Sequence, residues 1–539
     1  MTEHKHIGKI VGALMAAAVA FCLIVTLFAD RFVAVSGSSA TTMEYESTLF
    51  DTSEIMTVNI IMDEDQWQEL LDNAISEEYY ACDVEINGEM ISNVGIRAKG
   101  NTSLSSIAND PDTDRYSFKI KFDKYVDGQT CMGLDKLVLN NNFADATNRK
   151  EALVYDMFQY LGADASLYHY SKISVNGEYW GTYLALEAVE DSFKLRNYGV
   201  SDGNLYKPET MGMGNDQKED GGKPDGNPPE RPNNADFPSS EEGDLAKDNN
   251  PMDRPERPQG DFDQADMDEK FRNPQGDPGD FGNRNGGADL NYTDDDADSY
   301  STIWDGADGK VTDSDKERVV TAIKNINEGT NLTTYLDVDN ILKYMAVHEF
   351  VVNLDSLSGN MAHNYYLYEN DGQLNIIPWD YNLSFGGMTN GGMGGGPGRE
   401  STESSGATSM INDPIDTPFD GTDFFDALLE NEEYLAQYHE YLRQLAEEYV
   451  QGGRLQEVWE RLDAQTDELI ETDPTAFYTA AEYEEAKETL WTVLQLRAES
   501  VLGQLDGTIP STDDGQQNAQ DTLIDGSAID LSVMGEFNH

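Results

Sequence analysis

The first half of the chain alternates apolar and polar residues, which is the pattern of β-strands with one buried face. In "RYSFKIKF" the two phenylalanines and the isoleucine fall on one side, and Lys119 and Lys121 fall on the other. Two Asn-Gly pairs, Asn87-Gly88 and Asn176-Gly177, each separate two such runs and predict two-residue hairpin turns. We therefore expect this part of the chain to be rich in sheet.

Apolar residues recur at helical spacing in other segments. "DATNRKEALVYDMFQYLG" places Leu153, Met157 and Leu161 on one face, and "LDVDNILKYMAVHEFVVNLDS" has a similar apolar side. A hairpin turning at Asp371-Gly372 follows the second helix, and further helices are predicted from about residue 422 to residue 505. The order predicts an α+β fold with a sheet-rich N-terminal half and a helix-rich C-terminal half.

Composition divides the chain further. Residues 208–298 are dense in Pro, Gly, Asp, Asn and Glu, as in "KPDGNPPERPNN". Such a segment buries too little apolar area to offset its ordering entropy, so we predict a disordered acidic insertion. The remaining segments are then a tether at 30–50, a sheet-rich lobe at 51–207, a helix-rich lobe at 299–505 and a flexible tail at 506–539.

An uncharged apolar run near the N-terminus, Ile10 to Phe28, has the length of a membrane span. Lys5 and Lys9 precede it, so the positive-inside rule places the N-terminus in the cytoplasm. Residues 1–29 are therefore predicted to be a cytoplasmic stub and a transmembrane anchor in the cell membrane, with the rest of the chain extracellular. A cleaved signal peptide is the alternative, and it would make the protein secreted.

The charge balance limits the possible partners. The sequence holds 36 Lys and Arg residues against 101 Asp and Glu residues, a formal net charge of −65. This negative charge argues strongly against a nucleic-acid partner, because phosphate backbones need a basic surface. The balance suits a protein that binds cations or meets basic partners.

Acids and amides between residues 350 and 385 follow the order used in phosphoryl transfer from ATP. In protein kinases a catalytic aspartate precedes a metal-binding asparagine by five positions, and a second metal-binding aspartate comes later. Here Asp355 precedes Asn360 by the same five positions, and the predicted hairpin ends on Asp380 in "NIIPWDYNLSFGG". A lone aspartate at a strand end can also simply form a turn.

The sheet-rich half offers groups that suit phosphate. In "GIRAKGNTS", the residues Arg97, Lys99, Gly100 and Ser103 lie in a predicted turn where backbone amides can approach an anion. Lys119, on the strand that follows, could reach phosphate oxygens.

Glu151, one turn into the next predicted helix, could pair with Lys119. Lys121 or Lys99 could take the role of Lys119, and the alternating pattern alone does not rank Lys119 and Lys121, which share one face. His348 and His363 are expected to pack or form hydrogen bonds, since no second His or Cys sits at metal-ligand spacing.

Seven ordered segments together resemble the CotH kinase family, named for a bacterial spore-coat protein. They run from about residue 54 to residue 445, apart from the insertion, and read "VGIRAKGNTS", "YSFKIKF", "NGEYWGTYLALEAVEDSF", "NLYK", "VVNLDS", "AHNYYLY" and "IIPWDYNLSFG". The resemblance implies a degenerate protein-kinase-like fold. It also implies transfer of phosphate from ATP to serines of secreted or coat proteins, with Mg²⁺ as cofactor.

The resemblance also implies roles for particular residues. Asp355 in "NLDS" is similar to the family's catalytic-loop aspartate, and Asp380 in "WDYN" to its metal-binding aspartate. Asn364 in "HNYYLY" matches a position near the metal and so competes with Asn360 for the amide ligand. Many members carry an aspartate where this chain has Asn382, which weakens the case for a second metal.

Two functions therefore remain in view. The first is a membrane-tethered, extracytoplasmic CotH-like protein kinase that uses ATP and Mg²⁺ on a secreted, surface or spore-coat protein. The second is a non-catalytic surface or coat scaffold, in which a kinase-like domain has lost turnover and the acidic insertion binds cations. Asn382 and the scarcity of ATP outside cells favour the scaffold, and the seven matching segments favour the enzyme.

Overall fold

The computed structural model describes residues 41–210, 286–359, 361–388, 403–419 and 421–535. The predicted disordered insertion lies for the most part outside these residues. Its two ends do not, because residues 208–210 and 286–298 are described.

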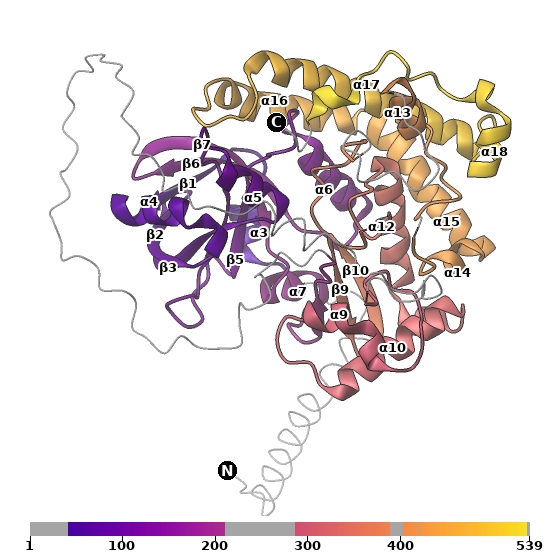
Figure 1. Ribbon diagram of the computed structural model, residues 1–539, viewed down its shortest axis with the longest axis horizontal. Coiled ribbons are helices and arrows are strands. Elements are labelled where there is room, and N and C mark those ends of the chain that lie inside the picture. Colours follow the sequence, from indigo (N-terminus) through magenta and orange to yellow (C-terminus); the bar gives the residue numbers. More distant parts are fainter. Residues whose placement is uncertain (1–40, 211–285, 360, 389–402, 420, 536–539) are drawn as a thin grey trace, which may run out of the picture. The chain divides into compact units, whose positions relative to one another are not determined.

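Seven strands in the N-terminal part close into a β-barrel (Figure 1). The order around the barrel is β1-β2-β3-β4-β5-β7-β6. All neighbours are antiparallel except β1 and β6, which run parallel and close the ring. The strands are β1 (Met56–Ile61), β2 (Tyr80–Ile86), β3 (Glu89–Lys99), β4 (Ser117–Lys121), β5 (Lys136–Asn140), β6 (Tyr168–Val175) and β7 (Glu178–Glu187).

Side chains alternate between the inside and the outside of the barrel. Ile96, Ile120 and Leu137 lie side by side on three neighbouring strands and belong to the interior apolar cluster. The predicted hairpins are confirmed, since Asn87-Gly88 joins β2 to β3 and Asn176-Gly177 joins β6 to β7. All four of these turn residues have positive φ, which is what a type I′ turn requires.

A second, three-stranded sheet has the order β10-β9-β8. Its strands are β8 (Asn204–Tyr206), β9 (Tyr365–Asn370) and β10 (Gln373–Pro378). β9 and β10 form the hairpin predicted at Asp371-Gly372, which is confirmed.

Helices make up most of the remaining described chain. Helix α6 (Lys150–Leu161) contacts β6 of the barrel and also helix α12 (Val338–Val351), so it links the barrel to the helical part (Figure 1). The other helices are α3 (Glu44–Thr48), α4 (Glu64–Asp72), α5 (Thr102–Asn109), α7 (Asp191–Tyr198), α9 (Ser301–Asp305), α10 (Asp313–Asn327), α11 (Leu332–Tyr335), α13 (Glu403–Ile411), α14 (Asp426–Leu429), α15 (Glu432–Arg443), α16 (Arg454–Glu471), α17 (Ala480–Leu505) and α18 (Asp513–Asn518).

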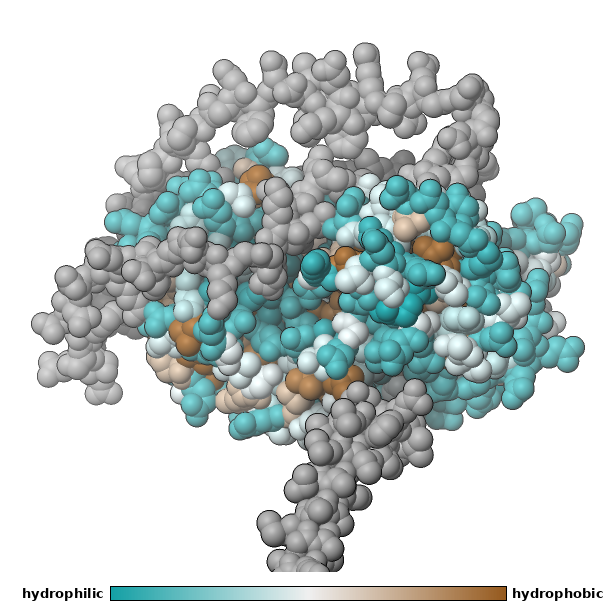
Figure 2. Space-filling view, turned by 90° about the horizontal axis from the view of Figure 1, so that it is seen from below, coloured by the Kyte–Doolittle hydropathy of each residue, from teal (hydrophilic) through white to brown (hydrophobic). Residues whose placement is uncertain are grey.

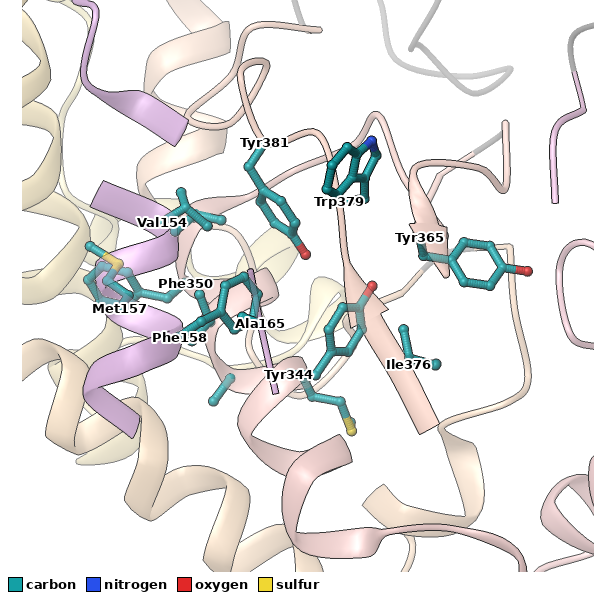
Figure 3. Close-up of a cluster of buried hydrophobic side chains, with 14 of the residues drawn as sticks. Val154, Met157, Phe158, Ala165, Tyr344, Phe350, Tyr365, Ile376, Trp379 and Tyr381 are labelled. Carbon is teal, nitrogen blue, oxygen red and sulfur yellow. The ribbon is translucent and has the colours of Figure 1, made fainter. Parts of the chain in front are cut away.

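A buried aromatic cluster fixes the segment after β10 against α6 and α12 (Figure 3). The ring of Phe158 on α6 lies 5.4 Å from that of Tyr381 and 6.3 Å from that of Tyr344 on α12. Aromatic pairs at these separations add stabilisation beyond the apolar area that they bury. The chain around residue 380 is therefore held by the core and not by loop contacts alone.

The exterior is largely hydrophilic on the face that Figure 2 presents, with hydrophobic residues in small separate groups. The large hydrophobic side chains that are exposed in the described residues are Ile75, Met90, Val126 and Tyr160.

The closed barrel shows that the predicted fold class, a degenerate protein-kinase-like fold with a transmembrane helix, is wrong. The physical reason is the parallel pairing of Met56–Ile61 with the segment around residues 171–175, which joins strands far apart in the sequence and closes the seven-stranded sheet on itself. Alternation within single strands carries no information about such a pairing.

The predicted membrane span, Ile10 to Phe28, lies outside the described residues. Within those residues, every helix is too short or too polar to cross a membrane. For the described part of the chain, the predictions of a transmembrane helix and of a single-pass membrane location are wrong, and we do not carry them further.

Residues of two segments that composition assigned to the insertion and to the flexible tail belong to the buried core. Ala288 and Leu290, within the segment assigned to the insertion, are fully buried. In the segment assigned to a flexible tail, Leu531 and Met534 are buried, and the backbone oxygen of Met534 accepts a hydrogen bond from the amide of Ala146.

Candidate active site

Asp355 lies in the loop that follows helix α12, and its carboxylate is fixed on both oxygens. His363 Nε2 donates to Asp355 Oδ1 at 2.7 Å, and Asn364 Nδ2 donates to Oδ2 at 3.0 Å. The same Asn364 amide also donates to the backbone oxygen of Asp355 at 2.8 Å. The carboxylate is therefore oriented by two residues of the segment that leads into β9.

Asp380 stands just past the end of β10, after Trp379, and is partly buried. Burial raises the pKa of the Asp380 carboxyl above its ordinary value, the charge of Lys99 lowers it, and the charge of Asp355 raises it. The two aspartates thus lie within electrostatic reach of each other. Two carboxylates that repel each other in this way suit a site that takes a cation.

Five non-glycine residues around these acids have a left-handed backbone: Val352, Ala362, Asn364, Asp380 and Phe385, with φ of 49, 46, 55, 60 and 58°. For a β-branched residue such as valine this conformation is a genuine outlier. Strained residues of this kind persist only where the surrounding structure determines them, and they cluster at active sites.

Glu151 reaches the site from the first turn of α6. Asp145 fixes this turn, because its Oδ2 accepts hydrogen bonds from the backbone amides of Arg149 and Lys150, each at 3.0 Å. The Glu151 side chain is 2 % exposed, and its Oε1 has no hydrogen-bond partner among the described residues. Burial, together with the charge of Asp380, raises the pKa of Glu151 to about 8.

An amide stands between Glu151 and Lys99. Asn140 Nδ2 donates to Glu151 Oε2 at 2.8 Å, and Lys99 Nζ donates to Asn140 Oδ1 at 2.7 Å. The charge of Lys99 acts on both Glu151 and Asp380, and it lowers the pKa of each.

Arg97 and Lys119, two other predicted phosphate contacts, lie on neighbouring strands of the barrel. Arg97 is 1 % exposed, and its guanidinium donates to Glu77 at 2.9 Å and to the backbone oxygen of Ala98 at 2.8 Å. Lys119 lies beside Arg97 and Val138 in the register of the barrel. Arg97 is thus held in a buried ion pair. The charge of Lys99 acts on both Glu151 and Asp380, and that of Lys207 also acts on Asp380.

Gly100 and Ser103 lie next to Lys99, where β3 ends and α5 begins. Gly100 has φ of +134°, a conformation that other residues rarely adopt, and a Cβ there would lie 2.9 Å from Ser103 Oγ. Asn101, the N-cap of α5, makes no capping hydrogen bond with its side chain. Asn360, the other predicted amide ligand, lies outside the described residues.

A buried histidine connects the Asp355 loop to the residue after Asp380. His348 Nε2 contacts Ser358 Oγ at 2.5 Å, and its Nδ1 contacts the hydroxyl of Tyr381 at 3.0 Å. Burial lowers the pKa of His348 to about 3, so the ring is neutral. The expectation that His348 and His363 form hydrogen bonds is confirmed, but sequence reasoning did not reveal that both hold the site.

The oxygen-rich donor set fits a magnesium ion. In the described ranges, no group of three or more His, Cys, Asp and Glu side chains is arranged to hold a metal. Mg²⁺ is usually held by one or two carboxylates together with substrate phosphates, so a site for it does not need such a group. Asp380 and the amide oxygen of Asn364 supply ligands of the right chemistry, and Glu151 Oε1 is a buried oxygen with no hydrogen-bond partner in the described chain.

The candidate site lies in a protein that joins a closed barrel to a helical part. Its two electrostatically linked aspartates follow α12 and β10. The family described as CotH kinase protein matches residues 96–501. The chain therefore belongs to the CotH kinase family, and the resemblance noted from the seven segments is confirmed. Comparison with curated proteins finds no match to the chain.

We expect Glu151 to make stability fall as pH rises. Its pKa, about 8 in the folded chain, exceeds the ordinary value of 4.5, so the folded state binds this proton more tightly than the unfolded state. The free energy of unfolding therefore decreases as pH increases between these two pKa values, by about 1.4 kcal/mol per pH unit at most. In Glu151→Gln this contribution is absent.

The measurement is thermal unfolding at pH 5 and pH 9 in chelator-containing buffer, for the wild type and Glu151→Gln. The difference in Tm, wild type minus variant, should become more negative at pH 9. Titrating groups that do not interact with Glu151 are common to both proteins and cancel in the difference. Equal pH slopes would contradict the raised pKa.

Proposed function

We propose that the chain transfers the γ-phosphate of ATP to a serine hydroxyl of a protein substrate, as the family's activity on secreted and coat proteins suggests. Membership of the CotH kinase family supports a kinase-like protein. The observation that carries the finer proposal is the Asp355 carboxylate, oriented by His363 and Asn364 within electrostatic reach of Asp380.

In this proposal Asp355 orients the substrate hydroxyl and accepts its proton. Its two oxygens each receive one hydrogen bond, so each keeps a further lone pair for the hydroxyl. A positioned carboxylate of this kind contributes to phosphoryl transfer mainly by orientation.

Asp380 would hold Mg²⁺, with the amide oxygen of Asn364 or Asn360 as a second ligand. The ion, when bound, neutralises charge on the phosphates. Asn364 is turned by its positive φ and donates its Nδ2 to Asp355, which leaves its amide oxygen available. Asn382 brings no charge to the site, so we propose a single metal.

Lys99 would contact the phosphates, in the place first assigned to Lys119. Its charge acts on both Glu151 and Asp380, and it directly precedes Gly100, which is followed by Asn101, the N-cap of α5. The backbone amides at the start of a helix favour an anion, so this turn and the lysine would act together on one phosphate.

We expect Lys99→Met to weaken Mg-ATP binding by about 10- to 100-fold, the loss of one hydrogen bond to a charged group. Lys119→Met, a matched change on the same barrel, should weaken it less than about threefold. Isothermal titration with Mg-ATP measures both, and circular dichroism checks that both variants fold. The reverse ranking would return the role to Lys119, as the sequence first indicated.

The function itself is tested by incubating the purified protein with ATP labelled on the γ-phosphate and with candidate acceptors. Label transferred by the wild type but not by Asp380→Ala supports the enzyme. Mg-ATP binding without transfer to any acceptor would favour the non-catalytic scaffold.

A further inference from the structure

Three strands of the barrel end side by side at the candidate site. Lys99 is the last residue of β3 and pairs with Ser117, the first of β4, while Asn140 is the last residue of β5. The side chains of Lys99 and Asn140 meet at 2.7 Å, and Glu151 of α6 lies 2.8 Å beyond. We call Lys99, Asn140 and Glu151 the amide relay.

The direction of the amide relay follows from its chemistry. A lysine ammonium only donates hydrogen bonds, so it must face the Oδ1 of Asn140. The Nδ2 of the same amide then points at the carboxyl group of Glu151. Asn140 is 8 % exposed and Glu151 is 2 % exposed, so water cannot readily replace either contact.

The amide gives the lysine a partner without neutralising it. A carboxylate in direct contact with Lys99 would hold the ammonium in an ion pair, and a phosphate would have to compete with that charge. The Asn140 oxygen instead accepts one of the three ammonium protons and leaves the positive charge uncompensated at that contact. The remaining protons can then be given to an anion.

We propose that Asn140 is a positioning residue that holds the Lys99 ammonium toward the phosphates and anchors it to α6 through Glu151. This inference rests on the proposed function, because it assumes that Lys99 meets ATP. Nothing in the spacing of the sequence indicates it, since "LNNNF" offers three asparagines in a row. Of these, Asn140 contacts both Lys99 and Glu151, whereas the Asn141 amide donates to Arg115 and the Asn142 amide to Asn148.

Asn140→Leu keeps the size of the side chain and removes both hydrogen bonds. We expect the Kd for Mg-ATP to rise about tenfold and the KM for ATP to rise with it, while kcat changes less than about threefold. Asn140→Ala is the second variant, in case leucine disturbs packing.

Asn204→Leu is the matched control. Asn204 Nδ2 donates at 2.9 Å to Glu369, a fully buried carboxylate that is also paired with Arg318, so this change removes a similar amide–carboxylate bond elsewhere. It should lower Tm to a similar extent and leave the Kd for Mg-ATP unchanged. A role of Asn140 in general stability alone would make the two variants alike in both measurements.

A double-mutant cycle separates action through Lys99 from any independent effect. On a Lys99→Met background, adding Asn140→Leu should change the Kd by less than about twofold. A full tenfold further loss on that background would overturn the proposal, as would an unchanged Kd in both single variants at Asn140. If the wild type itself fails to bind Mg-ATP, the proposed function fails and this inference with it. If Lys99→Met loses affinity but the Asn140 variants do not, only this inference fails.

Discussion

Asp355→Asn is expected to lower phosphoryl transfer by about 100- to 10,000-fold, the usual contribution of a positioned acid or base. The asparagine keeps the shape of the side chain but cannot accept the proton of the substrate hydroxyl. It also presents an amide group where His363 or Asn364 now donates a hydrogen bond. Mg-ATP binding should change much less, because the proposed metal ligand Asp380 and phosphate contact Lys99 are intact.

The measurement is single-turnover transfer of labelled phosphate, with Mg-ATP affinity determined on the same preparation. Asp371→Asn is the matched control, because Asp371 lies in the exposed β9–β10 turn and asparagine is favoured there before glycine. If Asp355→Asn transfers phosphate as fast as the wild type, Asp355 has only a structural role in the loop after α12.

Asp380→Asn should abolish the stabilisation by Mg-ATP and keep or raise the stability of the ligand-free protein. Burial and the charge of Asp355 both oppose ionisation of Asp380, so removing its charge relieves repulsion when no metal is bound. Asparagine is among the residues that best tolerate the φ of 60° found at this position. The turn itself should therefore survive the substitution.

Thermal unfolding with and without Mg-ATP checks this result. At a ligand concentration about 100 times the Kd, the wild type should gain about 2.7 kcal/mol of stability, and the variant none. Asp380→Ala should lose ligand-free stability as well, because alanine tolerates the left-handed backbone poorly. A ligand shift that survives in Asp380→Asn would mean that the aspartate forms only a turn.

Local signals in the sequence were sufficient for the hairpins, and they also pointed to two acids whose roles stay a prediction. Asn-Gly and Asp-Gly pairs require a specific backbone, so the turns at residues 87–88, 176–177 and 371–372 were predicted correctly. The five-residue spacing from Asp355 to Asn360 indicated the first acid, and the end of the predicted hairpin indicated Asp380. In the structure the charge of Asp355 acts on Asp380.

Other features depend on contacts that no periodic pattern contains. Arg97 and Lys99 are two residues apart on one strand, yet one is buried against Glu77 and the other reaches Asn140. The difference arises from their partners, Glu77 in a left-handed turn and Asn140 at a strand end. Sequence alone could propose a lysine for the site but could not choose among three of them.

The parallel pairing of β1 and β6 has a consequence for how the chain is synthesised. Val58 pairs with Ile173, so roughly 115 residues must follow β1 before its second neighbour exists. Until then one edge of β1 is an unpaired row of backbone groups, which is a template for association with other chains. Long-range closure of this kind is also slow. Ribosome-bound chains shorter than about 175 residues therefore carry an open edge, and the growing barrel is most exposed to chaperones and to aggregation in that interval.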